Sequence, residues 1–421
     1  MPVTQEEIGR RLRAAREAAS LTQEQVAERI GLSRSAIAQI ELGNRSVSSI
    51  ELDRLASLYS RDILDFFSEQ FANEDSLLAL FRANQDIAAK PETGDALRQC
   101  IAVGRELTNL ERLVGVPDES TSVVRYTVPE PRSRYDAIKQ GSGLAEQERR
   151  RLNLGDAQIE DISELLERQG IRTGMIDLPE DISGLTFVES KVGPFTVVNR
   201  GEHIARRTFS FAHEYAHVLL DCDLHGVISR TSDRSGIREV RANAFAANLL
   251  LPEAGVRQFL AELGKGGASR LFAETPTNDD QATAVEARDT SSTQEIRLHH
   301  VALLAHHFGT SRIMALYRLR NLQIISEREL AVLLEQERSG RGRQVAELLD
   351  LPEPDHVNER NRFRHRFLTL ALEAFTQERI TRSKLEELFA MVLKEPKSQT
   401  LLRDYGALLA DEPTGVSIPR K

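Results

Sequence analysis

Two histidines and a glutamate lie close together in an apolar stretch of the sequence. His213 and His217 are four residues apart, and Glu214 directly follows the first of them. If this stretch is a helix, the spacing places both imidazoles on one face, about one turn apart, where they can share a Zn²⁺ ion. Glu214 lies beside them, where a carboxylate can act on water without binding the metal. The pattern therefore predicts one zinc ion per chain and a hydrolytic site.

A third protein ligand would complete this site, because catalytic zinc sites hold three protein ligands and leave a fourth position to water. Glu239 opens the next helical stretch, and a carboxylate on a packed neighbouring helix would give a His₂Glu ligand set. We therefore predict Glu239 as the third ligand. The alternatives closely follow the first helix, which would have to end sharply for them to reach the metal: Asp221, Cys222, Asp223 and His225.

The elements around these residues form an α+β pattern. Three short β-branched runs come first, and we predict them as strands of a small sheet: residues 171–176, 184–188 and 194–198. Helices predicted over 204–220 and 237–251 then carry the candidate ligands, and Pro252 ends the second helix. Helices that cover a short sheet would hold the two histidines and Glu239 against each other.

Two longer motifs surround the candidate ligands. The first runs from Arg207 and Phe209 to the two histidines, and the second is Glu239-x-x-Ala-Asn-x-Phe-Ala, followed by Pro252. With both motifs in this order, residues 142–260 resemble the ImmA/IrrE family of bacterial metallopeptidases.

This resemblance implies a zincin-like peptidase fold and a protein substrate. It assigns zinc to His213, His217 and Glu239, and the role of general base to Glu214. It further implies that residues 195–199 form the edge strand beside the cleft, where an extended peptide could bind by strand addition. The group that stabilises the oxyanion stays open, with three candidates: Tyr215, His203 and His225.

The first sixty residues hold a separate motif. Their apolar residues recur at helical spacing in four short blocks. Thr22 begins a capping-box pattern and Gly31 follows as a stop signal for the second helix. With the ending Glu41-x-Gly43, this segment resembles the XRE, or lambda-repressor-like, helix-turn-helix over residues 5–60. The resemblance implies an all-α domain that binds DNA.

In that fold the third helix enters the major groove with its N-terminal residues at the base edges. Arg34 is then the candidate for a guanine contact, because its guanidinium can bond O6 and N7 together, with Ser35 and Gln39 beside it. The candidates for phosphate contacts are Gln23, Asn44 and Arg45. Residues 1–60 carry eight arginines and eight acidic side chains. A monomer should therefore bind duplex DNA weakly, and we expect a homodimer on a double-stranded operator.

Composition and turn signals divide the chain into four parts. We predict a helix-turn-helix domain over 1–67, a helical connector with a linker over 68–132, a peptidase domain over 133–325 and a helical region over 326–421. Polar residues 264–294 are predicted as a flexible insertion in the peptidase domain. The predicted fold class is multidomain: an all-α N-terminal domain, an α+β zincin-like domain with a small sheet, and a mainly α C-terminal region.

The overall composition is that of a folded protein. The 421 residues are 40% hydrophobic and 28% charged, and the net charge of −9 argues against adhesion of the whole surface to nucleic acid. No apolar run is long enough to span a membrane, so we expect no membrane partner. Two cysteines far apart fit a reducing compartment, and we expect a cytoplasmic protein.

Two weaker patterns are better explained by packing and solvation. Residues 299–322 are superficially similar to a second helix-turn-helix, but in this position they more closely resemble the trailing helix pair of the ImmA/IrrE family, which implies structural packing. In the C-terminal region arginines alternate with aromatic residues, a pattern that can hold single-stranded nucleic acid by stacking. We favour a solvated helix face for this set: Arg360, Arg362, Phe363, Arg364, Arg366 and Phe367.

The two resemblances together imply a DNA-binding transcriptional regulator with a zinc-dependent endopeptidase domain. Such a protein would cleave a partner regulator, or its own linker over 117–131, in response to a signal. The alternative is a non-proteolytic repressor or antitoxin-like regulator whose metal site is structural or sensory. Glu214 favours the peptidase, because a non-catalytic site does not need a carboxylate beside its ligands. The fused DNA-binding segment disfavours a general degradative protease.

Overall fold

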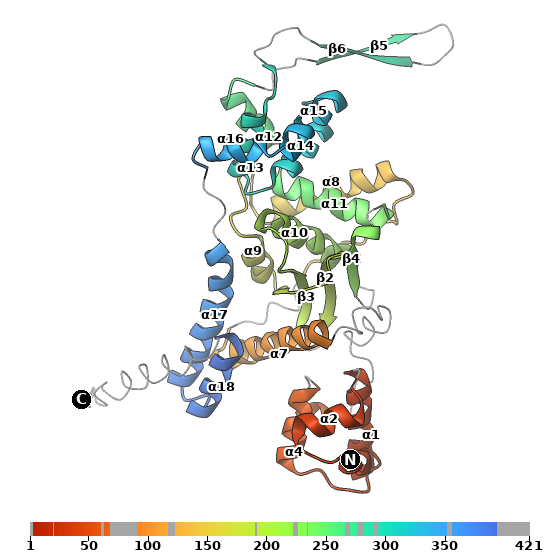
Figure 1. Ribbon diagram of the computed structural model, residues 1–421, viewed down its shortest axis with the longest axis vertical. Coiled ribbons are helices and arrows are strands. Elements are labelled where there is room, and N and C mark those ends of the chain that lie inside the picture. The colour runs from red at the N-terminus through yellow and green to blue at the C-terminus, as the bar shows by residue number, and fades with distance from the viewer. Residues whose placement is uncertain are drawn as a thin grey trace, which may run out of the picture.

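The structure is a computed structural model, drawn in Figure 1. It describes residues 3–19, 21–59, 63–67, 91–116, 123–189, 192–221, 226–233, 235–265, 270–276, 282–288, 294–351 and 356–393. Within these ranges no helix is both long enough and apolar enough to cross a membrane. A helical N-terminal unit, a central region with a small sheet and a helical C-terminal part follow one another along the chain, which confirms the predicted fold class.

The N-terminal unit consists of four helices, as the periodicity predicts: α1 (Gln5–Ala18), α2 (Gln23–Ile30), α3 (Arg34–Glu41) and α4 (Ser49–Leu58). Thr22 caps α2 in a capping box, and Gly31 ends it in the left-handed conformation, with φ 75°. Ser33 caps α3. The apolar faces meet in one core that includes Ile37. A 3-10 helix, η1 (Ile63–Phe67), follows α4 and adds Phe66 to this core.

Glu41 ties the end of α3 to the first two helices. Its carboxylate accepts from Arg16 Nε at 2.5 Å and Nη2 at 3.1 Å, and from Gln23 Nε2 at 2.8 Å. The Arg16 and Glu41 side chains are only 11% and 3% exposed. Gly43 follows with φ 75°, and α1 passes so close that a Cβ there would lie 2.7 Å from Cα of Glu6. These contacts explain in physical terms the Glu41-x-Gly43 ending of the motif.

We expect Glu41→Ala to destabilise the helix-turn-helix unit by about 3–5 kcal/mol, because the Arg16 guanidinium would remain buried without its counter-charge. The exposed ion pair Arg13–Glu17 lies on α1 and provides the control. Arg13→Ala removes this pair, leaves Arg16 and Glu41 in place, and should change the stability little. Hydrogen exchange of the α1–α4 amides in the full chain measures both free energies. Equal losses in the two variants would contradict a special role for Glu41.

A four-stranded sheet forms the centre of the next region, in the order β1-β3-β2-β4. Its strands are β1 (Arg172–Ile176), β2 (Ile182–Glu189), β3 (Gly193–Asn199) and β4 (Val227–Arg230). β1 and β3 are parallel, whereas the other pairs are antiparallel. The three predicted strands are present. The sequence does not predict β4, because it has four residues and lies among polar loop residues.

The position of β3 corrects the expected sheet edge. β3 pairs with both β1 and β2, so the expectation that residues 195–199 form the edge strand is wrong. Nearly every residue of β3 is buried, as is typical of an inner strand covered on both faces. The edge on the β2 side is β4.

Two helices cover the two faces of this sheet: α7 (Pro91–Val114) and α10 (Ile204–Leu220). α7 lies against Phe195, and a Cβ at Gly104 would collide with that ring. Phe187 stacks on Phe195 and therefore faces α7 as well. Because neighbouring residues of a strand point to opposite faces, Gly184 and Thr186 face α10. Part of the predicted connector is thus a structural layer of the central region.

Further helices surround α10: α8 (Arg134–Arg151), α9 (Ile162–Arg168), α11 (Ile237–Leu250) and α12 (Glu253–Glu262). In the upper part of Figure 1, below the strands β5 and β6, lies a helical layer of α13 (Leu298–His307), α14 (Arg312–Asn321), α15 (Glu327–Arg338) and α16 (Arg341–Leu348). α13 and α14, the segment similar to a second helix-turn-helix, contribute to the apolar core of this layer, as the packing interpretation predicts. The same core joins residues on both sides of the predicted boundary at 325.

The predicted flexible insertion contains a hairpin. β5 (Arg270–Pro276) and β6 (Ala282–Arg288) pair in antiparallel register. The sequence predicts no strands within this insertion. Small and β-branched residues alternate over 282–285, a weak strand pattern that the low content of large apolar residues conceals.

The C-terminal helices α17 (His356–Thr376) and α18 (Arg382–Val392) pack on α7 around Phe367 and Leu388. Arg366 pairs with Glu111 of α7 at 2.7 Å. Two members of the Arg and Phe pattern, Arg366 and Phe367, thus have structural contacts. The side chains of 360–363 lie outside the described residues.

The described part of the predicted linker, residues 123–131, lies along the core beside α10. Tyr126 N donates to Leu219 O at 2.9 Å, and its hydroxyl donates to Glu148. Val123 and Val128 pack against the same apolar core. This part of the linker is therefore held in place, while 117–122 lie outside the described residues.

Candidate metal centre and nucleic-acid interface

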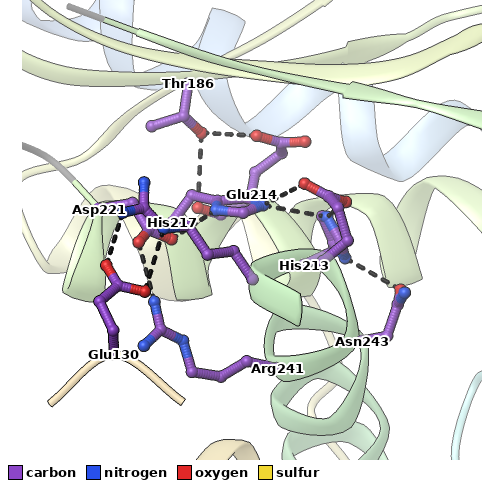
Figure 2. A network of polar contacts seen from close by, with 10 residues as sticks. Glu130, Thr186, His213, Glu214, His217, Asp221, Arg241 and Asn243 are labelled. Carbon is purple, nitrogen blue, oxygen red and sulfur yellow. Dashed lines mark hydrogen bonds and ion pairs between the residues drawn. The ribbon is translucent and has the colours of Figure 1, made fainter. Parts of the chain in front are cut away.

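The three predicted metal ligands converge from two helices, α10 and α11, and Figure 2 shows the two histidines with their neighbours. The Nε2 atoms of His213 and His217 are 3.2 Å apart. Glu239 places one carboxylate oxygen 3.0 Å from His213 Nε2 and the other 3.3 Å from His217 Nε2. All three residues are buried, and their ligand atoms lie within 4.8 Å of one another. This arrangement has the size and donor atoms for one small cation.

The other ring nitrogen of each histidine is held by a side chain. His213 Nδ1 lies 3.1 Å from Asn243 Oδ1, and His217 Nδ1 lies 2.7 Å from Asp221 Oδ2. Arg241 Nη2 in turn donates to Asp221 Oδ1 at 2.9 Å. Acceptors at both Nδ1 atoms favour a proton there. The Nε2 lone pairs then face the third ligand, which is the tautomer that metal binding requires.

The alternatives named for the third ligand divide into two groups. Asp221 contacts the Nδ1 side of His217, away from the point where the three ligand atoms meet. Cys222, Asp223 and His225 lie outside the described residues.

Glu214 is fully buried between α10 and the sheet. Thr186 Oγ1 donates to its Oε2 at 2.7 Å, and a Cβ at Gly184 would lie 2.7 Å from its Oε1. Oε1 makes no hydrogen bond of normal geometry among the described residues, although the Ser229 hydroxyl of β4 lies close enough to the carboxylate to offset part of the effect of burial on its pKa. Burial raises the pKa of the Glu214 carboxyl group. A raised pKa suits a carboxylate that must accept a proton near neutral pH.

Contact among the candidate ligands changes the pKa values of His217 and Glu239 strongly. Burial opposes the charge on His217, but hydrogen bonds to Asp221 and Glu239 outweigh it and raise the pKa of His217 to about 10. Burial also opposes the charge on Glu239, but hydrogen bonds from the two histidines lower the pKa of Glu239 to about 2. A proton is thus bound tightly between imidazole and carboxylate, and a divalent cation would compete with it for the same lone pairs.

A cleft of about 1270 Å³ opens onto the candidate ligands. His213 and Glu239 line it together with Ser229 of β4, and it continues to the helical layer of α13–α16. This volume exceeds the roughly 300–1,000 Å³ of small-molecule pockets. The cleft therefore has room for a stretch of polypeptide.

The three candidates for the oxyanion-stabilising group differ in access to this cleft. Tyr215 is fully buried, and its hydroxyl donates to Glu148 at 2.7 Å. His203 caps α10 through Nδ1 and lines the cleft. His225 lies outside the described residues.

The three predicted base-reading residues lie at exposed positions of α3: Arg34, Ser35 and Gln39. Arg34 and Ser35 stand in its first turn, and Gln39 lies one turn further along. Arg34 makes no ion pair with the part of the chain that the structure describes. An exposed N-terminal turn matches what a recognition helix presents to base edges.

The three predicted phosphate contacts already have partners within the domain. Gln23 Nε2 donates to Glu41, and Asn44 Nδ2 donates to Gln39 Oε1 at 3.1 Å. Arg45 pairs with a carboxylate of α4 at 2.6 Å, and its side chain is 40% exposed. Arg45 can therefore still reach a phosphate, whereas the Gln23 amide nitrogen is engaged inside the unit.

Several residues that support the candidate metal centre have no role predicted from the sequence. Asn243 lies one turn after Glu239, and this spacing could have placed it on the ligand face. Arg241 carries no comparable signal. Gly184 and Thr186 reach Glu214 only through the register of the sheet, which no local spacing reveals.

Two segments of the chain match known protein families. Residues 7–63 match the family described as a helix-turn-helix domain. Residues 166–274 match a peptidase family described as the IrrE N-terminal-like domain. No curated protein matches the chain. The chain therefore joins a helix-turn-helix DNA-binding domain to a metallopeptidase-like domain, as the two resemblances imply.

Proposed function

We propose that the chain is a transcriptional regulator whose zinc-dependent endopeptidase domain cleaves a protein partner in response to a signal. The observation that carries this proposal is the position of Glu214. It lies on the helix that holds His213 and His217, and its buried Oε1 makes no hydrogen bond of normal geometry among the described residues. A purely structural metal site is closed by its ligands and does not need such a group.

The donor set fits zinc. Two imidazole nitrogens and one carboxylate form a ligand set of catalytic zinc sites, and each imidazole is oriented through its other nitrogen. We assign one ion per chain to His213, His217 and Glu239. When bound, zinc would supply Lewis-acid polarisation of the peptide carbonyl and activation of water.

Glu214 would serve as general base and then as general acid. Its Oε1 can accept the proton of the attacking water and later return it to the leaving amine. Thr186 holds the other oxygen and so fixes the direction of Oε1. Gly184 leaves the space that the carboxylate occupies.

The edge strand β4 would bind the substrate chain. It pairs with β2 on one side, and no described strand pairs with its other side. Ser229 of β4 stands in register with Gly184, which places β4 beside Glu214. An extended peptide added to this edge would lie next to the candidate ligands.

The substrate would be a second protein rather than the chain's own linker. A peptidase tethered to a DNA-binding domain has a high effective concentration near whatever occupies the operator. The described part of the linker, residues 123–131, contacts the apolar core through Val123, Tyr126 and Val128. Cleavage there would require this segment to detach, so a partner regulator is the better candidate.

Metal removal and restoration tests this proposal. The full chain, freed of metal by a chelator, should cleave no co-encoded regulator, and about one equivalent of zinc per chain should restore cleavage. Fragments are measured by mass spectrometry, with and without operator DNA. A reloaded protein that leaves all co-encoded regulators intact would favour the structural or sensory metal site.

The predicted DNA contacts of the helix-turn-helix unit can be tested separately. Arg34→Ala should weaken operator binding by about 1–3 kcal/mol and relax selection at one base pair. Arg45→Ala should weaken binding to all sequences alike and reduce the slope of log K against log salt by about one. Fluorescence anisotropy over a salt series measures both. If neither variant differs from wild type, the helix-turn-helix unit contacts protein instead of DNA.

A further inference from the structure

The cleft extends beyond the candidate ligands along two helices. Phe209 of α10 lies one turn before His213, while Asn243 and Ala247 of α11 lie one and two turns after Glu239, and all of them line the cleft. Asn243 contacts His213. The two helix faces therefore run side by side away from the ligands and form a continuous floor.

Helix α14 forms a wall at the far end of this floor. Arg318 fastens it to the end of α11, because its Nε donates to Leu251 O at 2.8 Å and its Nη2 to Asn248 Oδ1 at 2.7 Å. Met314 packs against the apolar cores on both sides. α14 is thus held at a fixed position relative to α11.

This wall presents apolar side chains to the cleft. Ile313 and Tyr317 lie one turn apart on α14, both line the cleft, and each is 48% exposed. Other apolar residues of α14, such as Leu316 and Leu319, are fully buried in the helical layer. Apolar surface inside a cleft gains free energy when another apolar group covers it.

We propose that Ile313 and Tyr317 form a specificity subsite that binds one apolar side chain of the polypeptide substrate. This inference rests on the proposed function and deepens it. Its occupant is the substrate chain, because the subsite is continuous with the candidate metal centre through one cleft. The two turns from Glu239 to Ala247 span about 12 Å at about 1.5 Å per residue. An extended peptide covers that length with about four residues.

The first experiment measures which residues the enzyme selects around the cleaved bond. The zinc-loaded full chain cleaves a library of peptides made from a bacterial proteome, and mass spectrometry identifies the new ends. We expect enrichment of aliphatic or aromatic residues at one position about three to five residues from the bond. Tyr317→Ala should reduce this enrichment, while Tyr317→Phe should retain it. Val332→Ala is the matched control, because Val332 is 52% exposed on α15 and does not line the cleft.

The second experiment tests direct contact with a double-mutant cycle. The best peptide of the library is synthesised with its apolar residue intact or replaced by serine. With the wild-type protein and with Val332→Ala, serine should reduce kcat/KM about tenfold or more, mainly through KM. With Tyr317→Ala the same replacement should change kcat/KM less than about twofold, because the contact is already lost.

The outcomes separate this inference from the proposed function. Cleavage by the wild type with the same preferences in Tyr317→Ala, or equal serine effects in both proteins, would overturn the subsite alone. Absence of any cleavage by the zinc-loaded wild type would overturn the proposed function and the subsite with it. Circular dichroism of each variant shows whether the fold is retained. If Tyr317→Ala does not fold, Ile313→Ala gives the same test, because it removes the other apolar side chain of the subsite and should reduce both the enrichment and the effect of serine.

Discussion

Glu239→Ala and His213→Ala should each reduce bound zinc from about one ion per chain to a small fraction of that value. Each change removes one of only three protein ligands, and the remaining two cannot hold the ion against a competing chelator. Asn243→Ala should have a smaller effect, a loss of about 10–100-fold in affinity, because Asn243 orients His213 without touching the metal. Metal analysis after gel filtration in the presence of a chelator measures all three variants.

The matched comparison separates ligands from their supports. Glu253→Ala removes a carboxylate of the same type from an exposed ion pair on α12 and should leave zinc binding unchanged. Full zinc occupancy in Glu239→Ala would contradict the assignment. It would move the third ligand to one of the residues after Asp221 that lie outside the described part of the chain: Cys222, Asp223 or His225.

The local parts of the candidate site could be predicted because they depend on spacing within single helices. The helix predicted over 204–220 coincides with α10. His213 and His217 lie on one face of it, and their Nε2 atoms meet. Glu239 could be placed beside them because a second motif and the need for a third ligand indicated the same residue. The start and the end of α2 could be predicted in the same way, from the capping box at Thr22 and from Gly31.

The parts that could not be predicted depend on contacts between distant segments. β4 has too few apolar residues to be predicted as a strand, yet it forms the sheet edge beside the candidate metal centre. The contacts of Glu214 with Gly184 and Thr186 arise from the face that β2 turns toward α10. Nothing in the local sequence of β2 shows which face that is.

Asp221 illustrates how proximity in sequence can mislead. It follows His217 by four residues, so it was a reasonable candidate for the metal. In the structure its carboxylate reaches the Nδ1 side of the same ring and is held there by Arg241. The spacing correctly indicated contact between the two residues, but the side of the ring depends on the packing of α11 against α10.

Glu214→Gln should abolish most peptide cleavage while zinc remains bound. A general base contributes about 10²–10⁴-fold to the rate, and an amide of the same shape cannot accept the proton of water. The three candidate ligands are unchanged, so zinc content should stay at about one ion per chain. The measurement is kcat/KM on the peptide that the wild type cleaves best, with metal analysis of the same protein samples.

The position of Glu214 makes this variant a sharp discriminator between a catalytic and a sensory metal site. Its carboxylate is fully buried, and the Thr186 hydroxyl can donate to the amide oxygen of glutamine as it does to Oε2, so the fold should tolerate the change. Glu253→Gln makes the same chemical change at an exposed ion pair and should leave cleavage unchanged.

If Glu214→Gln cleaves like the wild type, another group must accept the proton. If neither protein cleaves and cells carrying Glu214→Gln regulate normally, the metal acts as a structural or sensory element. Loss of both cleavage and regulation in Glu214→Gln, with zinc retained, is the result that a proteolytic switch requires.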